Sequence, residues 1–187
     1  MQHALIPYYD EASYLDNERA ESIRHEYVAG EVFAMAGASK RHGTLAGNVA
    51  IALRQHLRGQ PCGVWMVDMK VRVKANSDFS AFYYPDVVAT CDPSDLNPDA
   101  QEDFLEAPKL VVEVLSDSTE AVNRREKLLS YRRLPSLQEY VLIDQNKAWV
   151  EVFRRTPVHT AEGAGKKPPA FPPYVLVFGC SGCNHAR

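Results

Sequence analysis

The sequence predicts an α/β fold with a central mixed β-sheet flanked by helices. Residues 110–115 (LVVEVL) form an apolar run of strand length, which is typical of a strand covered on both faces. Residues 40–58 place leucine and valine at four-residue steps, which is typical of a helix with one apolar face. Because buried strands need helices over their faces, the two patterns together predict a layered domain.

Length and composition favour an ordinary soluble protein. The chain has 187 residues, enough for one domain with a substantial core, and its formal net charge of −3 gives no general attraction to nucleic acid. We find no leader pattern and no apolar run of membrane-spanning length, so we expect a cytoplasmic protein without membrane contact. In that compartment we expect the four cysteines to be reduced thiols; they are Cys62, Cys91, Cys180 and Cys183.

The N-terminal third predicts a helix, a hairpin and a second helix. Residues 8–23 carry an imperfect apolar stripe, and residues 25–36 form two short strand patterns around a tight Ala29-Gly30 turn. The helix over 40–58 has Ser39 as its expected N-cap and ends at Gly59.

Three strand patterns follow this helix. Residues 65–74 alternate between apolar and polar positions, which predicts one strand with a solvent-exposed and mostly basic face. We expect that face to be solvated, with DNA contact as the less favoured alternative. A strand near 84–88 and the strand over 110–115 come next, with a loop over 92–108 between them.

The C-terminal third predicts a helix and further strands. Asp117 and Glu120 have the spacing of a capping box, and the helix that they open ends before Pro135. Residues 139–153 predict two strands joined by a turn at 145–147. Residues 156–173 are rich in Gly, Lys and Pro and predict an extended crossing, followed by a last strand at 174–178.

Two carboxylates stand out among these strands. Glu113 lies in the middle of the buried run, where an ionised carboxylate is unfavourable unless a positive group meets it. Asp86 follows Pro85 at the start of the neighbouring strand pattern. The two acids could share a hard divalent cation such as Mg²⁺, which takes oxygen ligands. The structural alternatives are a turn residue for Asp86 and an ion pair with Arg125 for Glu113.

Several longer stretches carry a resemblance to a known family. They are HEYVAGEVFAMAGASKRH, YYPDVVATCD, PKLVVEVLSDST and REKLLSYRRLPSLQEYVLID, together with the strand over 150–153. In this order the chain resembles the PD-(D/E)XK nuclease superfamily, in particular its bacterial branch of Uma-type restriction endonucleases. The resemblance implies a restriction-endonuclease-like core of order αβββαβ, with an N-terminal helix and hairpin. It covers roughly residues 8–155, so we expect one domain over 1–155 and a divergent tail over 156–187.

The function implied by this resemblance is metal-dependent hydrolysis of phosphodiester bonds in DNA. Asp86 and Glu113 match the metal-ligating acids of the family, the carbonyl of Val114 is a further implied ligand, and Mg²⁺ is the expected ion, with Mn²⁺ as a substitute. The superfamily lysine two positions past the second acid is replaced here by Leu115. The Uma-type branch carries a lysine on the following helix, and Lys127 matches that position. The resemblance also implies a homodimer, since superfamily members often pair to cut both strands.

The spacing of Lys127 permits this replacement. If the helix begins near residue 118, Lys127 lies about 13 Å along its axis, at 1.5 Å per residue. The same distance back along the preceding strand is about four residues, at 3.3 Å each. A helix that folds back over its strand therefore brings Lys127 level with Glu113. We expect Lys127 to orient or deprotonate the attacking water, or to neutralise charge at the phosphorus.

Four more residues are candidates for supporting or phosphate-contacting roles. They are Glu31 on the hairpin and the cluster Lys40, Arg41 and His42 at a helix start, where cations oppose the helix macrodipole. Plain surface roles are the alternative for each. The second functional hypothesis is a nuclease fold that binds nucleic acid or protein without catalysis. Lys127 favours the enzyme, because a degenerate scaffold would not need a replacement lysine.

Overall fold

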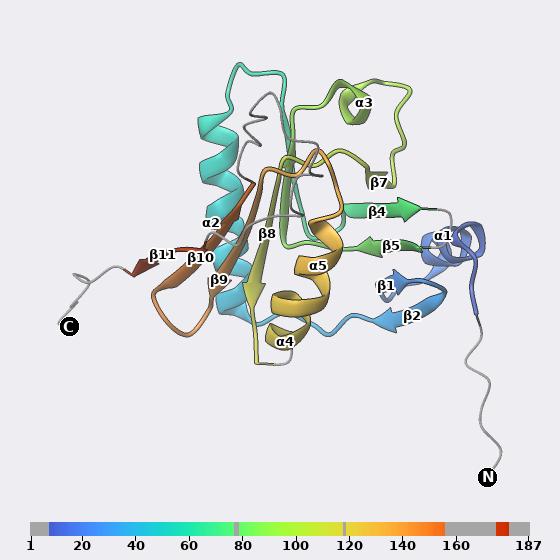
Figure 1. The fold of residues 1–187 in the computed structure, drawn as a ribbon, viewed down its shortest axis with the longest axis horizontal. Helices are drawn as coiled ribbons and strands as arrows, with labels where there is room; N and C mark the ends of the chain where they lie inside the picture. The colour runs from blue at the N-terminus through green and yellow to red at the C-terminus, as the bar shows by residue number, and fades with distance from the viewer. Residues whose placement is uncertain (1–7, 77–78, 118, 156–174, 180–187) are drawn as a thin grey trace, which may run out of the picture.

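The computed structural model describes residues 8–76, 79–117, 119–155 and 175–179. It confirms the α/β class, with helices flanking two mixed sheets (Figure 1). In chain order the elements are α1 (Glu11–Ala20), β1 (His25–Val28), β2 (Glu31–Ala34), α2 (Lys40–His56), β3 (Gly63–Met66), β4 (Lys70–Asn76), β5 (Phe79–Tyr83), β6 (Val87–Thr90), α3 (Pro93–Leu96), β7 (Phe104–Leu105), β8 (Leu110–Leu115), α4 (Glu120–Val122), the π-helix η1 (Asn123–Lys127), α5 (Leu128–Tyr131), β9 (Glu139–Asp144), β10 (Trp149–Arg154) and β11 (Val175–Gly179).

The strands form two sheets, whereas the sequence predicted one central sheet. The larger sheet has the order β11-β10-β9-β8-β6-β3, and only its β8–β9 pair is parallel. The smaller sheet has the order β2-β1-β5-β4-β7, with a parallel β4–β7 pair. The number of sheets was not predictable from local patterns, because alternation shows that a strand exists and not which strand it pairs with.

Strand β8 lies inside the larger sheet and is covered on both faces, as its apolar run predicted. On one face, Val112 and Val114 share a buried cluster with the apolar side of α2. On the other face, Val111 and Leu115 pack with Tyr131 of α5 and with residues of β4 and β5. Side chains alternate along a strand, so Glu113 points to the same face as Val111 and Leu115.

The predicted hairpin and the helix over 40–58 are confirmed. Ala29 and Gly30 form the hairpin turn at φ 48° and 96°, and the Ser39 side chain caps α2 by accepting a hydrogen bond from the backbone N–H of His42 at 3.1 Å. The predicted helix over 8–23 is confirmed only over Glu11–Ala20, where the Asp10 side chain caps the first turn.

The predicted single strand over 65–74 is wrong. Two strands in different sheets, β3 and β4, occupy this stretch, and the chain turns between them at Val67, whose φ is 68°. The predicted solvated face holds for Asp68 and Lys74, which are exposed, and is wrong for Lys70 and Arg72. Lys70 is only 7% exposed, and Arg72 forms ion pairs with Glu11 of α1 and Glu106. The helix that covers this face lies far away in sequence, so alternation alone could not reveal the burial.

The helix predicted after Asp117 differs in its start and its form. Thr119 is the N-cap and makes no side-chain capping bond, so the predicted capping box of Asp117 and Glu120 is wrong. The helical segment contains the π-helix η1 between α4 and α5. The predicted loop over 92–108 contains the short helix α3 and strand β7.

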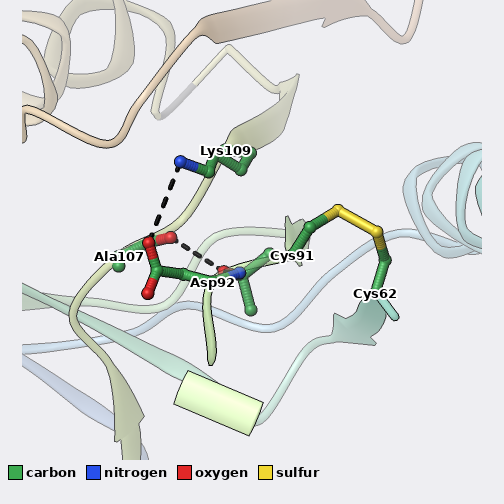
Figure 2. The surroundings of a disulfide bond; sticks show 6 residues. Cys62, Cys91, Asp92, Ala107 and Lys109 are labelled. Atoms are coloured by element: carbon green, nitrogen blue, oxygen red, sulfur yellow. Dashed lines mark hydrogen bonds and ion pairs between the residues drawn. A yellow bond between two sulfur atoms is a disulfide. The ribbon is translucent and has the colours of Figure 1, made fainter. Parts of the chain in front are cut away.

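Cys62 and Cys91 form a disulfide, so the prediction of reduced thiols is wrong for this pair (Figure 2). The β3–β6 ladder pairs Gly63 with Thr90, and one further step in the same register places the two cysteines opposite each other. Cys180 and Cys183 lie outside the described residues.

The remaining predictions concern the tail and the membrane. Strand β11 pairs with β10, close to the predicted position of a last strand. The crossing over 156–173 lies outside the described residues, and the domain boundary at 155 stays a prediction. Within the described part of the chain, no helix combines the length and the apolar character that a membrane span requires.

Candidate active site

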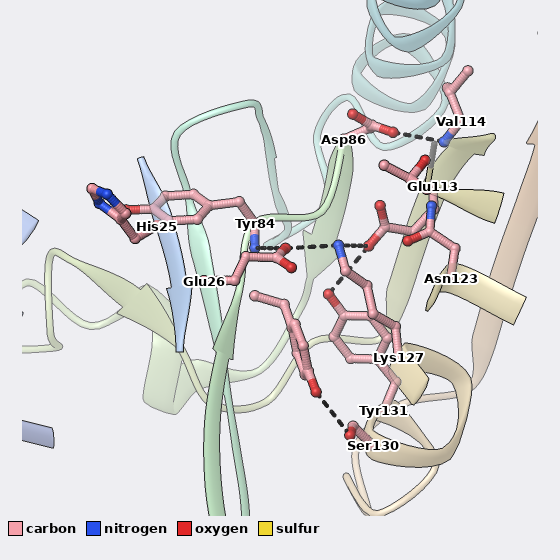
Figure 3. Close-up of polar contacts among 12 residues, drawn as sticks. His25, Glu26, Tyr84, Asp86, Glu113, Val114, Asn123, Lys127, Ser130 and Tyr131 are labelled. Carbon is pink, nitrogen blue, oxygen red and sulfur yellow. Dashed lines mark hydrogen bonds and ion pairs between the residues drawn. The ribbon is translucent and has the colours of Figure 1, made fainter. Parts of the chain in front are cut away.

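Asp86 lies directly before β6, where this strand begins to pair with β8. The ladder pairs Val87 with Val112, and continuing it by one residue places Asp86 opposite Glu113. The two predicted acids are therefore neighbours across two adjacent strands. The Asp86 carboxylate accepts a hydrogen bond from the backbone N–H of Val114 at 2.6 Å, which fixes the side chain against β8 (Figure 3).

The predicted juxtaposition of Lys127 and Glu113 is confirmed. The Lys127 ammonium donates to Glu113 Oε1 at 3.2 Å, and the two side chains are 7% and 4% exposed. The hydroxyl of Tyr131 also donates to Glu113 Oε1, at 3.4 Å. Lys127, and not Arg125, is thus the residue that pairs with Glu113, and a helix and a strand joined by a short connection bring the two together.

The π-helix η1 ends at Lys127 and directs two polar residues toward the sheet. Asn123 and Lys127 are its buried members. The side-chain oxygen of Asn123 is buried and has no hydrogen-bond partner in the described part of the structure. Single π-turns inside helices occur often at functional sites. The segment thus carries a buried, unpaired acceptor about one helical turn before the lysine that contacts Glu113.

Glu26 belongs to the site and was missed by the sequence analysis. Its Oε1 accepts from the Lys127 ammonium at 2.7 Å and from the backbone N–H of Tyr84 at 3.2 Å. Glu31, which was predicted instead, is exposed on β2, opposite Val28. Both acids lie on the same hairpin, and no local pattern separates them. Only the pairing of β1 with β5 turns Glu26 toward Lys127.

The first turn of α2 brings His42 to the site. Its Nε2 lies 3.0 Å from the carbonyl oxygen of Val114 and 3.3 Å from Asp86 Oδ2. The hydrogen bond with Asp86 raises the pKa of His42 above its usual value, against burial, which lowers it. Lys40 and Arg41 in the same turn are exposed, and Arg41 donates to the carbonyl of Gln145.

Burial and nearby charge shape the titration of the site. Burial raises the pKa of Glu113 to about 8, while the Lys127 ammonium acts in the opposite direction. Burial disfavours the charged form of Lys127, but Glu113 and Glu26 raise its pKa above the usual value. Lys127 contacts two of the three carboxylates in this region, Glu26 and Glu113, whereas the third, Asp86, lies against His42. With its pKa near 8, Glu113 is mostly uncharged at neutral pH, and a cation bound beside it would favour its charged form.

The donor atoms suit a hard divalent cation. Carboxylates and a backbone carbonyl are the oxygen ligands that Mg²⁺ prefers. Asp86 Oδ2 and the carbonyl oxygen of Val114 both face the same position, which the Nε2 of His42 approaches. The Glu113 carboxylate is held by Lys127 instead. Among the described residues, no three or more His, Cys, Asp or Glu side chains are assembled around a common metal position. The residues fit the ion chemically, and Glu113 would have to exchange partners.

Comparison with known proteins identifies the family. The model of the Uma2 family, described as "Putative restriction endonuclease", matches residues 11–173. The chain is a member of the Uma2 family. Uncharacterized protein slr1290 of Synechocystis sp. is 33% identical over 152 residues, covering 81% of this chain and 77% of that protein. Uncharacterized protein sll1609 of the same organism is 30% identical over 144 residues, covering 77% and 79%. The predicted resemblance is confirmed.

A solved structure shares the fold of this Uma2 protein. A crystal structure from Anabaena variabilis, described as a "putative nuclease belonging to DUF820", superposes with a TM-score of 0.65 and covers 89% of this chain and 82% of that one. The two sequences are 15% identical. At this identity the similarity shows the fold alone, which is a nuclease-like α/β fold.

Proposed function

We propose that this Uma2 protein is a Mg²⁺-dependent endonuclease that hydrolyses phosphodiester bonds in DNA, with Mn²⁺ as a substitute ion. The observation that carries the proposal is the buried Lys127 ammonium, 3.2 Å from Glu113 on the strand next to Asp86. A lysine and two acids of this kind are the constellation expected of the family. Here the lysine comes from a helix and not from the strand of Glu113.

The roles follow from the contacts. Asp86, Glu113 and the carbonyl of Val114 would hold the ion. A bound Mg²⁺ supplies Lewis-acid polarisation of the phosphate and a more acidic water. Lys127 donates to two carboxylates, which favours its charged form, so it acts as a cation that stabilises negative charge at the phosphate and not as a base. An ammonium has three donors, and Glu26 and Glu113 take two of them.

Local positive charge supports DNA as the substrate. The protein has a formal net charge of −3, so attraction to the DNA backbone has to come from particular residues. Lys40 and Arg41 are exposed in the helical turn that carries His42 to the site. We propose that they contact phosphates beside the scissile bond. Lys and Arg contacts to phosphates would make binding strongly dependent on salt.

A non-catalytic nucleic-acid-binding module is the second candidate. The ion pair between Glu113 and Lys127 favours this candidate. A carboxylate that is bound to Lys127 does not share a metal position with Asp86 among the described residues. In that role the Glu113–Lys127 pair would be structural.

Incubation of supercoiled plasmid with Mg²⁺ or Mn²⁺ separates the two candidates. We expect the wild-type protein to nick or linearise the plasmid, and Asp86→Ala and Glu113→Ala to leave it intact. Glu31→Ala, a change at an exposed acid of the same molecule, is the matched control and should cleave normally. Undiminished cleavage by both site variants would refute the proposed site. Intact DNA across many duplex and single-stranded substrates would favour the binding module.

We further propose that the protein acts as a homodimer, since one site per subunit cuts one strand at a time. Sedimentation with and without a short duplex measures the number of copies. A single copy on DNA that is nevertheless cut in both strands would contradict this part of the proposal.

A further inference from the structure

The imidazole of His42 reaches the point on which two expected metal ligands converge. Its Nε2 lies 3.0 Å from the carbonyl oxygen of Val114 and 3.3 Å from Asp86 Oδ2. The side chain is 14% exposed and comes from the first turn of α2, which the Ser39 cap fixes. No other element of the site approaches both oxygens among the contacts of the described residues.

The geometry requires that Nε2 carries a proton. The carbonyl of Val114 can only accept a hydrogen bond, and Asp86 Oδ2 already accepts one from the backbone N–H of Val114. A nitrogen that faces two acceptors must donate. In a normal hydrogen bond the hydrogen lies about 1.9–2.0 Å from its acceptor. Mg²⁺ lies about 2.0–2.1 Å from its oxygen ligands, so the positive end of the N–H group occupies nearly the position of a cation.

We infer that His42 is a placeholder for the metal ion: its N–H group satisfies Asp86 and Val114 in the metal-free protein and leaves them when the ion binds. This inference rests on the proposed function and adds a residue that competes with the ion. A protonated Nε2 cannot ligate a metal, so in this arrangement His42 opposes binding.

A placeholder has a physical purpose in this site. Without a donor at this point, the Val114 carbonyl would lose its hydrogen bond from His42, and the Asp86 carboxylate would keep only the one from the Val114 N–H. Unsatisfied buried acceptors are unfavourable. Lys127 does not provide this donor, because its ammonium is engaged by Glu26 and Glu113. His42 therefore stabilises the metal-free fold at the expense of metal affinity.

Calorimetric titration of the full-length protein with Mn²⁺, without DNA and at one fixed pH, tests the inference. His42→Ala removes the competing donor, so Mn²⁺ should bind about two- to tenfold more tightly, the equivalent of one released hydrogen bond. His42→Gln retains a side-chain N–H donor and should stay near the wild-type affinity. His42→Ser is a second short variant in case His42→Ala folds poorly, and circular dichroism checks the fold of each.

Lys40→Ala separates the contact from a general charge effect. It removes a cation from the same helical turn, and tightening as large as that of His42→Ala would overturn the inference. Unchanged binding in His42→Ala and His42→Ser would overturn it as well. A weakening of about 10- to 100-fold would do so too, because it would identify His42 as a supporting group or ligand. Each of these outcomes, seen with a wild-type protein that binds Mn²⁺ and cleaves DNA, would refute the placeholder role of His42 and leave the proposed function intact. If neither the wild-type protein nor any variant binds Mn²⁺ or cleaves, the proposed function fails and the inference fails with it.

Discussion

The structure contains two groups of buried and half-buried charged and polar side chains that differ in their number of carboxylates. The N-terminal cluster consists of Glu18, His25, Lys70 and Tyr84, and the site cluster consists of Glu26, Asp86, Glu113 and Lys127. They adjoin at β1, where His25 and Glu26 are consecutive, and at Tyr84, whose backbone N–H donates to Glu26 (Figure 3).

The N-terminal cluster has one carboxylate and one lysine. Glu18 is 3% exposed and accepts from the backbone N–H of His25 at 2.9 Å and from the Tyr84 hydroxyl at 2.9 Å. Lys70 in turn donates to the same hydroxyl at 3.3 Å. Glu18 and Lys70 thus share the Tyr84 hydroxyl as a common partner.

The site cluster has three carboxylates and one lysine. Its lysine is shared between Glu26 and Glu113, while Asp86 relies on a backbone N–H group and on His42. Burying charge without compensation is costly to a fold. Burial alone does not indicate function, since each cluster contains a fully buried acid and a fully buried lysine. The site cluster differs because two of its acids, Asp86 and Glu113, lie opposite each other on neighbouring strands, where the proposed cation would be held.

The largest expected effect concerns the two buried lysines. Lys127→Met should lower the rate of plasmid cleavage about 10²- to 10³-fold, because it removes a preorganised positive charge from the reacting phosphate. Lys70→Met, at the equally buried lysine of the N-terminal cluster, should cleave at nearly the wild-type rate. Initial rates under saturating Mg²⁺ measure both. Equal losses in the two variants would mean that burial, and not position in the site, accounts for the effect.

The second effect is the response of stability to metal. Mn²⁺ at 100 times its dissociation constant should raise the free energy of unfolding by about 2.7 kcal/mol, since it binds the folded chain only. Glu113→Gln should lose this gain, and Glu18→Gln, which removes the acid of the N-terminal cluster, should keep it. Urea unfolding with and without Mn²⁺ measures the gain. A gain that disappears in Glu18→Gln as well would place the cation between the clusters.

The third effect compares the hydroxyl of Tyr84 in the N-terminal cluster with that of Tyr131, which donates to Glu113 of the site cluster. Tyr84→Phe leaves Glu18 and Lys70 without their shared partner and should destabilise the protein by about 1–3 kcal/mol. Tyr131→Phe removes only the 3.4 Å bond to Glu113 and should cost about 0.5–1.5 kcal/mol. Urea unfolding of the metal-free proteins gives both values. The comparison breaks down if the order is reversed.

The smallest effect is the pH dependence of the metal-free site. The hydrogen bond with Asp86 raises the pKa of His42 above its ordinary value of 6.5, so protonated His42 favours the folded state. The stabilisation is fully present below that ordinary value and is lost as the pH rises through the raised pKa. The stability advantage of the wild-type protein over His42→Gln should therefore decline toward alkaline pH. A difference that is constant with pH would show that the charge of His42 contributes nothing.

Local patterns predicted those parts of the site that lie within one stretch of sequence. The apolar run around Glu113 predicted a strand buried on both faces. The family resemblance pointed to Lys127, and the spacing showed only that it could lie level with Glu113; the structure shows the contact. The break at Val67 was missed, since alternation continues through a change of sheet.

The sequence by itself determined the class of fold, because apolar periodicity acts within a few residues, and the resemblance of its longer stretches pointed to the family and to Lys127 as the partner of Glu113. Only the tertiary structure decided that Glu26 and not Glu31 reaches Lys127, that Lys70 is buried, and that His42 meets Asp86 and Val114. Each of these contacts joins elements far apart in the chain. Pairing of distant strands and docking of helices fix them, and no local pattern records which face of a hairpin will meet another strand.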